Sequence, residues 1–183
     1  MNDKEFERLL LSVQKPGRYS GGEINSVVKD KNKVDVRFAF CFPDTYEIGM
    51  SHLGIKILYS QFNERDDIWC ERVFAPCEDF EKIMREKNIP LFGLESRDSI
   101  RDFDFIGFTL QYEMSYTNIL NMLDLAGVPL RAADRTELSP LVVAGGPCCS
   151  NAEPIADFFD LFFLGEGEEV DLEVIDLYKE YKK

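Results

Sequence analysis

Two patterns of hydrophobic positions alternate along the chain, one typical of helices and one typical of buried strands. Apolar residues at three- and four-residue spacing predict amphipathic helices, and they recur over residues 3–14, 48–62, 78–87, 112–126 and 170–181. Short and nearly continuous apolar runs predict buried strands. These runs fall at residues 34–42, 71–75, 90–94, 103–109, 141–144 and 161–164.

Strands that alternate with helices of this length are typical of βαβ units, whose right-handed crossovers produce a parallel sheet. We therefore predict an α/β fold of the Rossmann or flavodoxin type. It is an open, mostly parallel sheet of five or six strands with helices on both faces. Because residues 15–22 are rich in glycine and proline, they separate the first helix from the rest. The predicted organisation is an N-terminal helix and loop over residues 1–30 and an α/β domain over residues 31–183.

The charge of the chain argues against direct binding to nucleic acid. It has 21 Lys and Arg residues against 34 Asp and Glu, a net charge of −13. Nucleic-acid affinity depends on cationic groups that displace counterions, and this chain has few. No apolar run approaches the roughly 20 residues that cross a bilayer, and the charged N-terminus does not resemble a signal peptide. We expect a cytoplasmic protein without membrane contacts, and the oligomeric state stays open.

The five cysteines fit neither a disulfide framework nor a zinc site. Their number is odd, and no secretory signal accompanies them. No two of them show the C-x-x-C spacing of a zinc ligand pair. We expect reduced cysteines, buried for the most part, at Cys41, Cys70, Cys77, Cys148 and Cys149.

Ligands bind to open parallel sheets beyond the carboxyl ends of the strands. The predicted strands end at residues 41–44, 109–112, 145–148 and 165–168, with a fifth end near residues 94–96. Glycines at several of these ends let a ligand approach the backbone, which suits a bulky flat ligand. The candidate binding residues are Asp44, Tyr46, Gly49, Ser51, His52, Thr109, Gln111, Gly145, Gly146, Gly165, Glu166 and Gly167.

Acidic residues around the last glycines argue against a phosphate ligand. The fingerprints G-x-G-x-x-G and G-x-x-x-x-G-K-[ST] are absent, and carboxylates in the loop would repel a pyrophosphate. A simpler alternative is that Glu166, Glu168 and Glu169 lie in the first turn of the last helix, where the helix dipole favours acidic groups. Both interpretations stay open at this point.

His52 is the only histidine of the chain and follows the first predicted sheet strand. It is either a capping or packing residue or a side chain that faces the ligand edge. A catalytic metal site would need further cysteines or carboxylates at suitable spacing, and none is so spaced. The nucleophile motif G-x-S-x-G is also missing. No catalytic residue and no metal ligand is therefore predicted.

Residues 15–25, 43–54 and 145–168 together resemble a family of radical SAM proteins that carry an N-terminal cobalamin-binding domain. The resemblance extends from Lys15 to Glu169. It implies a following radical SAM barrel as the partner of this domain. That barrel would bind a four-iron four-sulfur cluster through a Cys-x-x-x-Cys-x-x-Cys motif and cleave S-adenosylmethionine. Because the cysteine motif is absent here, we expect an isolated or truncated domain that is not catalytic alone.

The same resemblance implies cobalamin as the cofactor, bound without a histidine ligand to cobalt. Cobalamin-binding proteins with a histidine ligand carry the pattern Asp-x-His-x-x-Gly. Here Met50 replaces the aspartate before His52, and Gly54 comes one residue early. A carboxylate normally fixes the tautomer of a metal-bound imidazole, and no neighbouring residue supplies one.

Two alternatives to cobalamin binding follow from the residues. The domain could have lost its cofactor and act as an interaction or substrate-positioning module. Phe42, Tyr46, Gln111 and Tyr112 would then fill the space of a nucleotide tail. A flavodoxin-like flavin site is the other alternative, which the acidic loops disfavour.

Overall fold

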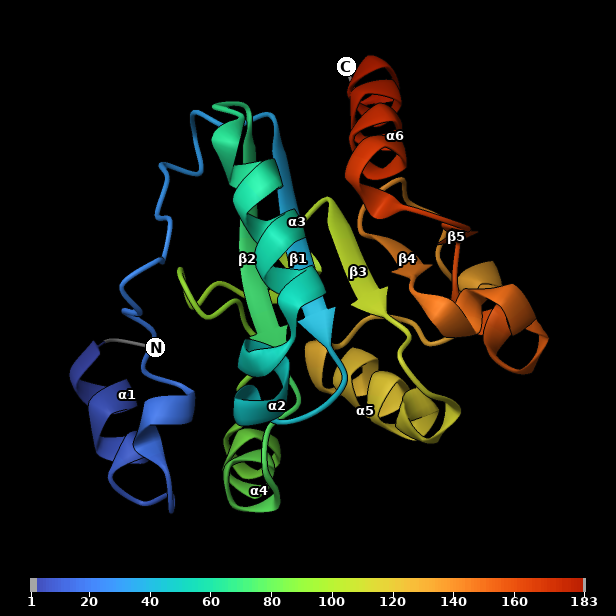
Figure 1. Cartoon of the computed structure of the whole chain (residues 1–183). Helices are drawn as coiled ribbons and strands as arrows, with labels where there is room; N and C mark the ends of the chain where they lie inside the picture. Colours follow the sequence, from blue (N-terminus) through green and yellow to red (C-terminus); the bar gives the residue numbers. More distant parts are fainter. Residues whose placement is uncertain (1–2, 183) are drawn as a thin grey trace.

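The computed structural model describes residues 3–182 and is built on a parallel five-stranded sheet. The spatial order is β2-β1-β3-β4-β5, which confirms the predicted open α/β architecture (Figure 1). The sheet therefore has five strands, the lower of the two predicted numbers. They are β1 (Val36–Phe42), β2 (Ile68–Phe74), β3 (Phe105–Thr109), β4 (Leu141–Gly145) and β5 (Leu161–Phe162).

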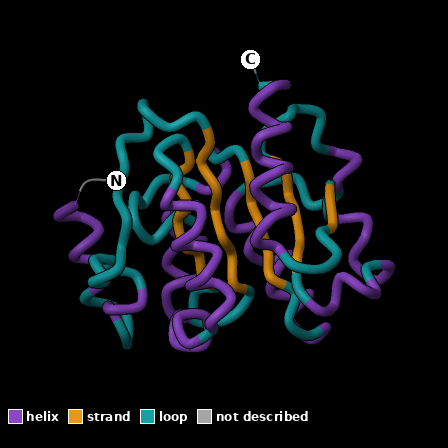
Figure 2. Tube along the Cα trace, turned by 45° about the horizontal axis from the view of Figure 1, so that its top comes forward, coloured by secondary structure: helices purple, strands orange, loops and turns teal. Residues whose placement is uncertain are grey.

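Helices cover both faces of the sheet, as Figure 2 shows. The structure contains α1 (Asp3–Leu10), α2 (Tyr46–Ser51), α3 (Leu53–Glu64), α4 (Glu78–Lys87), α5 (Tyr116–Ala126) and α6 (Gly167–Tyr181). Helices α3 and α6 share one hydrophobic cluster with the sheet, and α1, α4 and α5 share the other. Short 3₁₀ helices occupy some connections, at Pro16–Arg18, Ile100–Asp102, Glu113–Ser115, Ala132–Asp134, Pro147–Asn151 and Glu153–Phe158.

The central strand β1 is buried along its whole length and contributes side chains to both hydrophobic clusters. Because successive side chains of a strand point to opposite faces, Phe38 and Phe40 join the cluster of α3 and α6. Ala39 and Cys41 join the cluster of α4 and α5. This double burial explains why β1 reads as a continuous apolar run and not as an alternating one.

The predicted strand at residues 90–94 is wrong. Phe92 makes a single antiparallel bridge with Ser99, and the amide of Leu91 donates to the carbonyl of Leu125 at the end of α5. The amide of Leu94 donates to the carbonyl of Arg72 in β2 at 2.8 Å, and the other backbone bonds of this segment go to turns and a helix end, so the segment does not pair along β2 as a strand. The fifth strand end expected near residues 94–96 consequently does not exist at the ligand edge.

Glu95 instead holds this segment against strand β2 through a buried ion pair. Its carboxylate accepts a hydrogen bond from Arg72 Nε at 2.7 Å and from the Arg72 amide at 2.8 Å. Burial raises the pKa of Glu95, and the charge of Arg72 acts against that rise. The guanidinium also stacks on Tyr59 and contacts Glu23 at 3.3 Å. Arg72 therefore ties the N-terminal loop and residues 90–96 to the sheet.

The helix predicted over residues 48–62 is interrupted. His52 takes the extended conformation, with φ −76° and ψ 124°, and so ends α2 and begins α3. The N-terminal helix is also shorter than predicted, since α1 ends at Leu10. Among residues 3–182, no helix combines the length and the apolar character needed to cross a bilayer.

Helix α6 is anchored mainly through its C-terminal half. The Tyr178 hydroxyl donates to Asp104 at 2.8 Å, and Asp176 forms an ion pair with Arg65 at 2.6 Å. Lys179 pairs with Asp67. Near the start of the helix, Gln61 of α3 donates to the backbone carbonyl of Glu168 at 2.6 Å.

Candidate functional site

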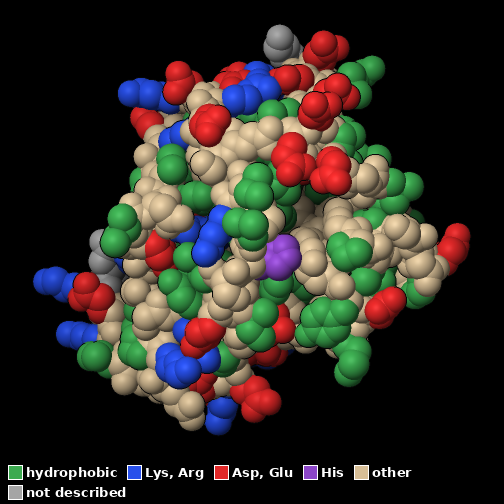
Figure 3. Space-filling view, in the orientation of Figure 1, with side chains coloured by type: hydrophobic (Ala, Val, Ile, Leu, Met, Phe, Trp, Pro, Cys, Tyr) green, Lys and Arg blue, Asp and Glu red, His purple; other side chains and the backbone are tan. Residues whose placement is uncertain are grey.

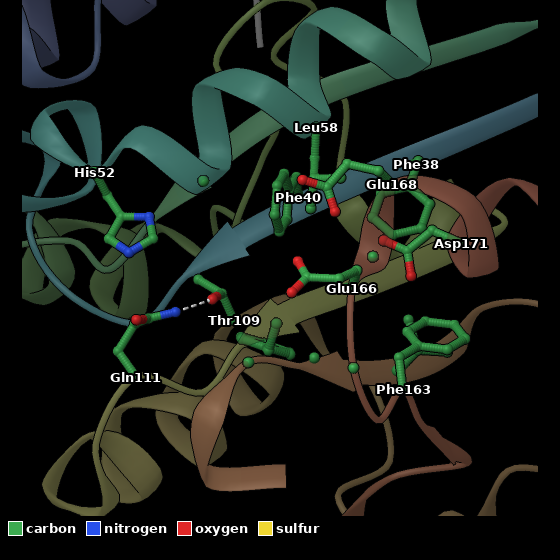
Figure 4. A pocket seen from close by; sticks show the side chains of 18 residues that line it. Phe38, Phe40, His52, Leu58, Thr109, Gln111, Phe163, Glu166, Glu168 and Asp171 are labelled. Atoms are coloured by element: carbon green, nitrogen blue, oxygen red, sulfur yellow. Dashed lines mark hydrogen bonds between the residues drawn. The ribbon is translucent and has the colours of Figure 1, made fainter.

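A pocket of about 190 Å³ lies on the face of the sheet that α3 and α6 cover (Figure 4). It extends from the carboxyl ends of β3 and β4 inward over β1, between α3 and α6. The order in which successive strands join the sheet reverses between β1 and β3, and open α/β sheets bind ligands at such a reversal. The lining is made of Phe38, Phe40, His52, Gly54, Leu58, Gly107, Phe108, Thr109, Gln111, Val143, Gly145, Gly146, Phe163, Gly165, Glu166, Gly167, Glu168 and Asp171.

The outer end of the pocket carries polar side chains and open glycines. Gln111 Nε2 donates to Thr109 Oγ1 at 2.5 Å, just beyond β3. A Cβ built on Gly145 would meet no atom within 4 Å, so this residue leaves open space at the end of β4. Gly146 has φ +103°, and a Cβ there would lie 2.9 Å from the carbonyl oxygen of Leu110. The loops after β3 and β4 can therefore approach each other only with glycine at position 146.

His52 lies at the outer end and reaches the surface in the middle of this face (Figures 3 and 4). Its ring packs 5.3 Å from the ring of Phe42, and Gly54 leaves room for it, because a Cβ there would come 3.0 Å from the imidazole. Among the described residues the buried Nδ1 atom has no hydrogen-bond partner. Packing and not a carboxylate thus positions this imidazole.

The inner end of the pocket is mostly apolar. Phe38 from β1, Leu58 from α3 and Phe163 after β5 surround it. The ring of Phe38 lies directly over Gly107 of β3, where a Cβ would come 2.4 Å from the ring. The glycine of β3 therefore allows an aromatic ring to form the floor of the pocket.

Three carboxylates enter this pocket from one short segment. Glu166 precedes α6, Glu168 lies in its first turn, and Asp171 follows on the next turn. Asp171 is only 8% exposed, and its Oδ1 atom has no hydrogen-bond partner among the described residues. Burial, together with the charge of Glu168, raises the pKa of Asp171 to about 7. No Lys or Arg lines the pocket, so its electrostatic character is acidic.

Eight of the twelve candidate residues predicted from the sequence line the pocket. The other four candidates lie outside it, in the β1–α2 connection and in α2. Asp44 accepts a hydrogen bond from the Tyr112 hydroxyl at 3.3 Å, and Tyr46 donates to Glu23 at 3.0 Å. Gly49 is buried against Phe74, and Ser51 donates to the backbone carbonyl of Ile48 at 2.7 Å. The eight are His52, Thr109, Gln111, Gly145, Gly146, Gly165, Glu166 and Gly167.

The sequence reasoning missed the side chains of the inner end. Phe38, Phe40 and Leu58 occur at spacings that predict core positions, and a pocket over the sheet uses the same positions. Asp171 could have been found, because the buried residues of α6 are Asp171, Ile175 and Tyr178, at helical spacing i, i+4, i+7. An acidic residue at a core-facing position is a signal for a site.

Comparison with known proteins identifies the family. The family described as "Radical SAM proteins, N-terminal" matches residues 54–183, more than half of the chain. The chain belongs to this radical SAM N-terminal family. The match includes most of the pocket lining, but Phe38, Phe40 and His52 precede it.

One relative of this radical SAM N-terminal domain is the uncharacterized protein MJ0966 of Methanocaldococcus jannaschii. It is 30% identical over 141 residues, which are 75% of this chain and 26% of the relative. The chain thus spans about a quarter of the length of that protein. No solved structure matches the chain. Within residues 3–182, no three His, Cys, Asp or Glu side chains form a group that could bind a metal ion.

Proposed function

We propose that the chain is the accessory domain of a radical SAM protein and binds cobalamin at the carboxyl edge of its sheet, without a histidine ligand to cobalt. The observation that carries the proposal is the open pocket at the β1/β3 reversal, where Gly145 leaves space at a strand end. The family match supports the association with a radical SAM domain. Catalysis, the iron–sulfur cluster and S-adenosylmethionine would belong to that partner domain.

The open glycines at the strand ends support a large, flat and mostly uncharged ligand. A pocket of about 190 Å³ is too small for a whole corrin, so the ring system would rest on the loops that end β3, β4 and β5. Thr109 and Gln111 would offer hydrogen-bonding groups there, and Gly145 and Gly165 would allow close contact with the backbone. Bound cobalamin would supply a cobalt centre for redox or group-transfer chemistry.

The environment of His52 supports binding without a histidine ligand. Metal-bound imidazoles normally donate their second ring nitrogen to a carboxylate or carbonyl group. The Nδ1 atom of His52 has no such partner among the described residues. On this proposal His52 contributes a packing surface at the rim of the site.

Retention of the corrin tests the proposal. The purified chain is incubated with hydroxocobalamin and desalted, and the corrin absorbance that stays with the protein is measured. We expect retention by the wild type and at least tenfold weaker binding by Gly145→Val, because the added side chain projects into open space at the site. Gly17→Val is the matched control, since a Cβ at Gly17 also meets no atom within 4 Å but lies outside the pocket. No retention by the wild type, alone or joined to its radical SAM domain, would contradict the proposal.

A second candidate function is a cofactor-free interaction or substrate-positioning module of the radical SAM protein. Large apolar side chains are exposed in the loops at the carboxyl edge, with Met114 85% and Leu164 71% exposed. However, Phe42, Tyr46 and Tyr112 do not line the pocket, and of the four side chains expected to fill such a space only Gln111 does. This candidate would gain support if Met114→Lys weakened association with the radical SAM domain while no form of the protein retained corrin.

A further inference from the structure

The inner end of the pocket has a recognition chemistry of its own, separate from the loops that would support a corrin. It is reached from the outer end, along the face of the sheet, and ends at Asp171. Figure 4 shows the Asp171 side chain between Phe38 and Phe163. The pocket volume of about 190 Å³ exceeds the roughly 150 Å³ of a cavity known to hold benzene. The pocket as a whole therefore has room for a group the size of one ring.

The Asp171 carboxyl lacks the partner that a buried carboxyl normally has. Its side chain is 8% exposed and its Oδ1 atom is unpaired among the described residues. Burying a polar atom without a hydrogen bond costs free energy, because the atom loses its water. A ligand that pairs with this atom would remove that penalty, so binding energy is available at this position.

The surroundings of Asp171 select for positive charge. Glu168 and Glu166 also line the pocket, and no Lys or Arg side chain does. An anion would be repelled by these carboxylates, whereas a cation would relieve the repulsion between Asp171 and Glu168. The rings of Phe38, Phe40 and Phe163 present the aromatic surface that stabilises organic cations.

We propose that the inner end of the pocket is a binding site for a small organic cation, an ammonium group on a compact apolar body, that pairs with the carboxylate of Asp171. This goes beyond the cobalamin proposal and does not depend on it, because it concerns the inner end and not the loops of the rim. Where the carboxyl is protonated, the cation displaces that proton to the solvent.

Matched probes of one size test the charge preference. Benzylamine, which is cationic between pH 6 and 8, is compared with neutral benzyl alcohol and anionic phenylacetate by NMR titration of the purified chain. We expect benzylamine to bind at least tenfold more tightly than benzyl alcohol at pH 8, and phenylacetate not to bind. Equal affinities for the amine and the alcohol would overturn the proposal.

The pH dependence identifies the group that is responsible. With the pKa of Asp171 near 7, its ionised fraction rises about tenfold from pH 6 to pH 8, and benzylamine affinity should rise by the same factor. The other titratable groups facing the pocket are Glu166, Glu168 and His52, while α3 and the strands contribute only uncharged side chains to the lining.

Two variants separate Asp171 from His52. In Asp171→Asn the preference for benzylamine over benzyl alcohol should disappear, and the affinity for benzylamine should no longer depend on pH. The affinity for benzyl alcohol should be unchanged. In His52→Gln both the preference and the pH dependence should remain. If Asp171→Asn binds benzylamine as the wild type does, or if the pH dependence disappears in His52→Gln instead, the proposal is wrong. Corrin retention is measured separately, so failure of either proposal leaves the other result readable.

Discussion

Gly107 and Phe38 lie against each other on neighbouring strands, so closely that a Cβ on Gly107 would come 2.4 Å from Cζ of the phenylalanine ring. The ring also stacks on Phe105 with centroids 5.5 Å apart and meets Phe62 at 5.0 Å. It has little freedom to move away. A missing side chain on β3 thus decides where the floor of the pocket lies.

Gly107→Ala should therefore destabilise the fold. We expect a loss of about 1–3 kcal/mol in the free energy of unfolding, since the methyl group must displace a packed ring. Urea denaturation followed by fluorescence of Trp69 measures it. Gly145→Ala provides the comparison at the end of the next strand, where a Cβ has open space, and its stability should stay within about 0.5 kcal/mol of the wild type. Equal losses in the two variants would contradict this account of the pocket floor.

Gly146→Ala should also be destabilising, for a reason of backbone conformation. Gly146 has φ +103° and ψ 175°, a region that side chains other than glycine rarely adopt. We expect a loss of about 1–3 kcal/mol. The same urea titration measures it, and Gly145→Ala, one residue earlier and without a positive φ, again serves as the control. A neutral Gly146→Ala variant would show that the turn after β4 can relax.

Asp171 should make the protein less stable as the pH rises. The pKa of its carboxyl is about 7 in the folded state, above the ordinary 3.8, so the folded state holds a proton that the unfolded state has lost. Its contribution to stability then falls between about pH 4 and pH 7 and stays constant above. The full effect is at most about 4 kcal/mol, from three pH units at 1.36 kcal/mol each.

The comparison between the wild type and Asp171→Asn measures this contribution. The difference in unfolding free energy should be small near pH 4 and favour the variant near pH 8. A difference that does not change with pH would mean that the carboxyl is ionised throughout the range. A variant less stable than the wild type at pH 8 would mean that Asp171 has a partner that stabilises its charge.

Removing only one partner of the Arg72–Glu95 ion pair should strongly lower the free energy of unfolding. Their side chains are 2% and 0% exposed, so Arg72→Met leaves a buried carboxylate without its partner. Such losses typically reach about 3–5 kcal/mol. The double variant Arg72→Met with Glu95→Leu should recover much of the stability, which denaturant titration of all the variants would show. No recovery in the double variant would mean that Arg72 acts through Tyr59 and Glu23 instead.

The sequence predicted the architecture well, because its signals are local. The apolar run of β1, the helical spacing of α4 and the glycine that ends α5 each depend on a few neighbouring residues. Gly127 indeed ends α5 with φ +68°, and α4 occupies the predicted residues 78–87. The strand predicted at residues 90–94 failed because two of its backbone partners, Leu125 for Leu91 and Arg72 for Leu94, are distant in the sequence.

The candidate site was predicted at its outer end and missed at its inner end. Thr109 and Gly145 end β3 and β4, and Gly165 follows β5 by three residues, in the region where the general rule for parallel sheets already places ligands. Phe38 and Leu58 occupy positions that serve equally for a core and for a pocket. The distance between α3 and α6 on the sheet decides between these roles. That distance cannot be read from the sequence of either helix.

The uneven anchoring of α6 bears on how large a ligand the domain can admit. Tyr178 and Asp176 hold the C-terminal half of the helix to the sheet and to the end of α3, while the half that carries Glu168 and Asp171 is bonded to α3, among the described residues, through Gln61. The C-terminal half of α6 is therefore held more firmly than the half that lines the pocket. A ligand larger than the pocket would therefore have to displace the first turns of α6, which would break the hydrogen bond of Gln61 and loosen the contact of Leu172 with the core.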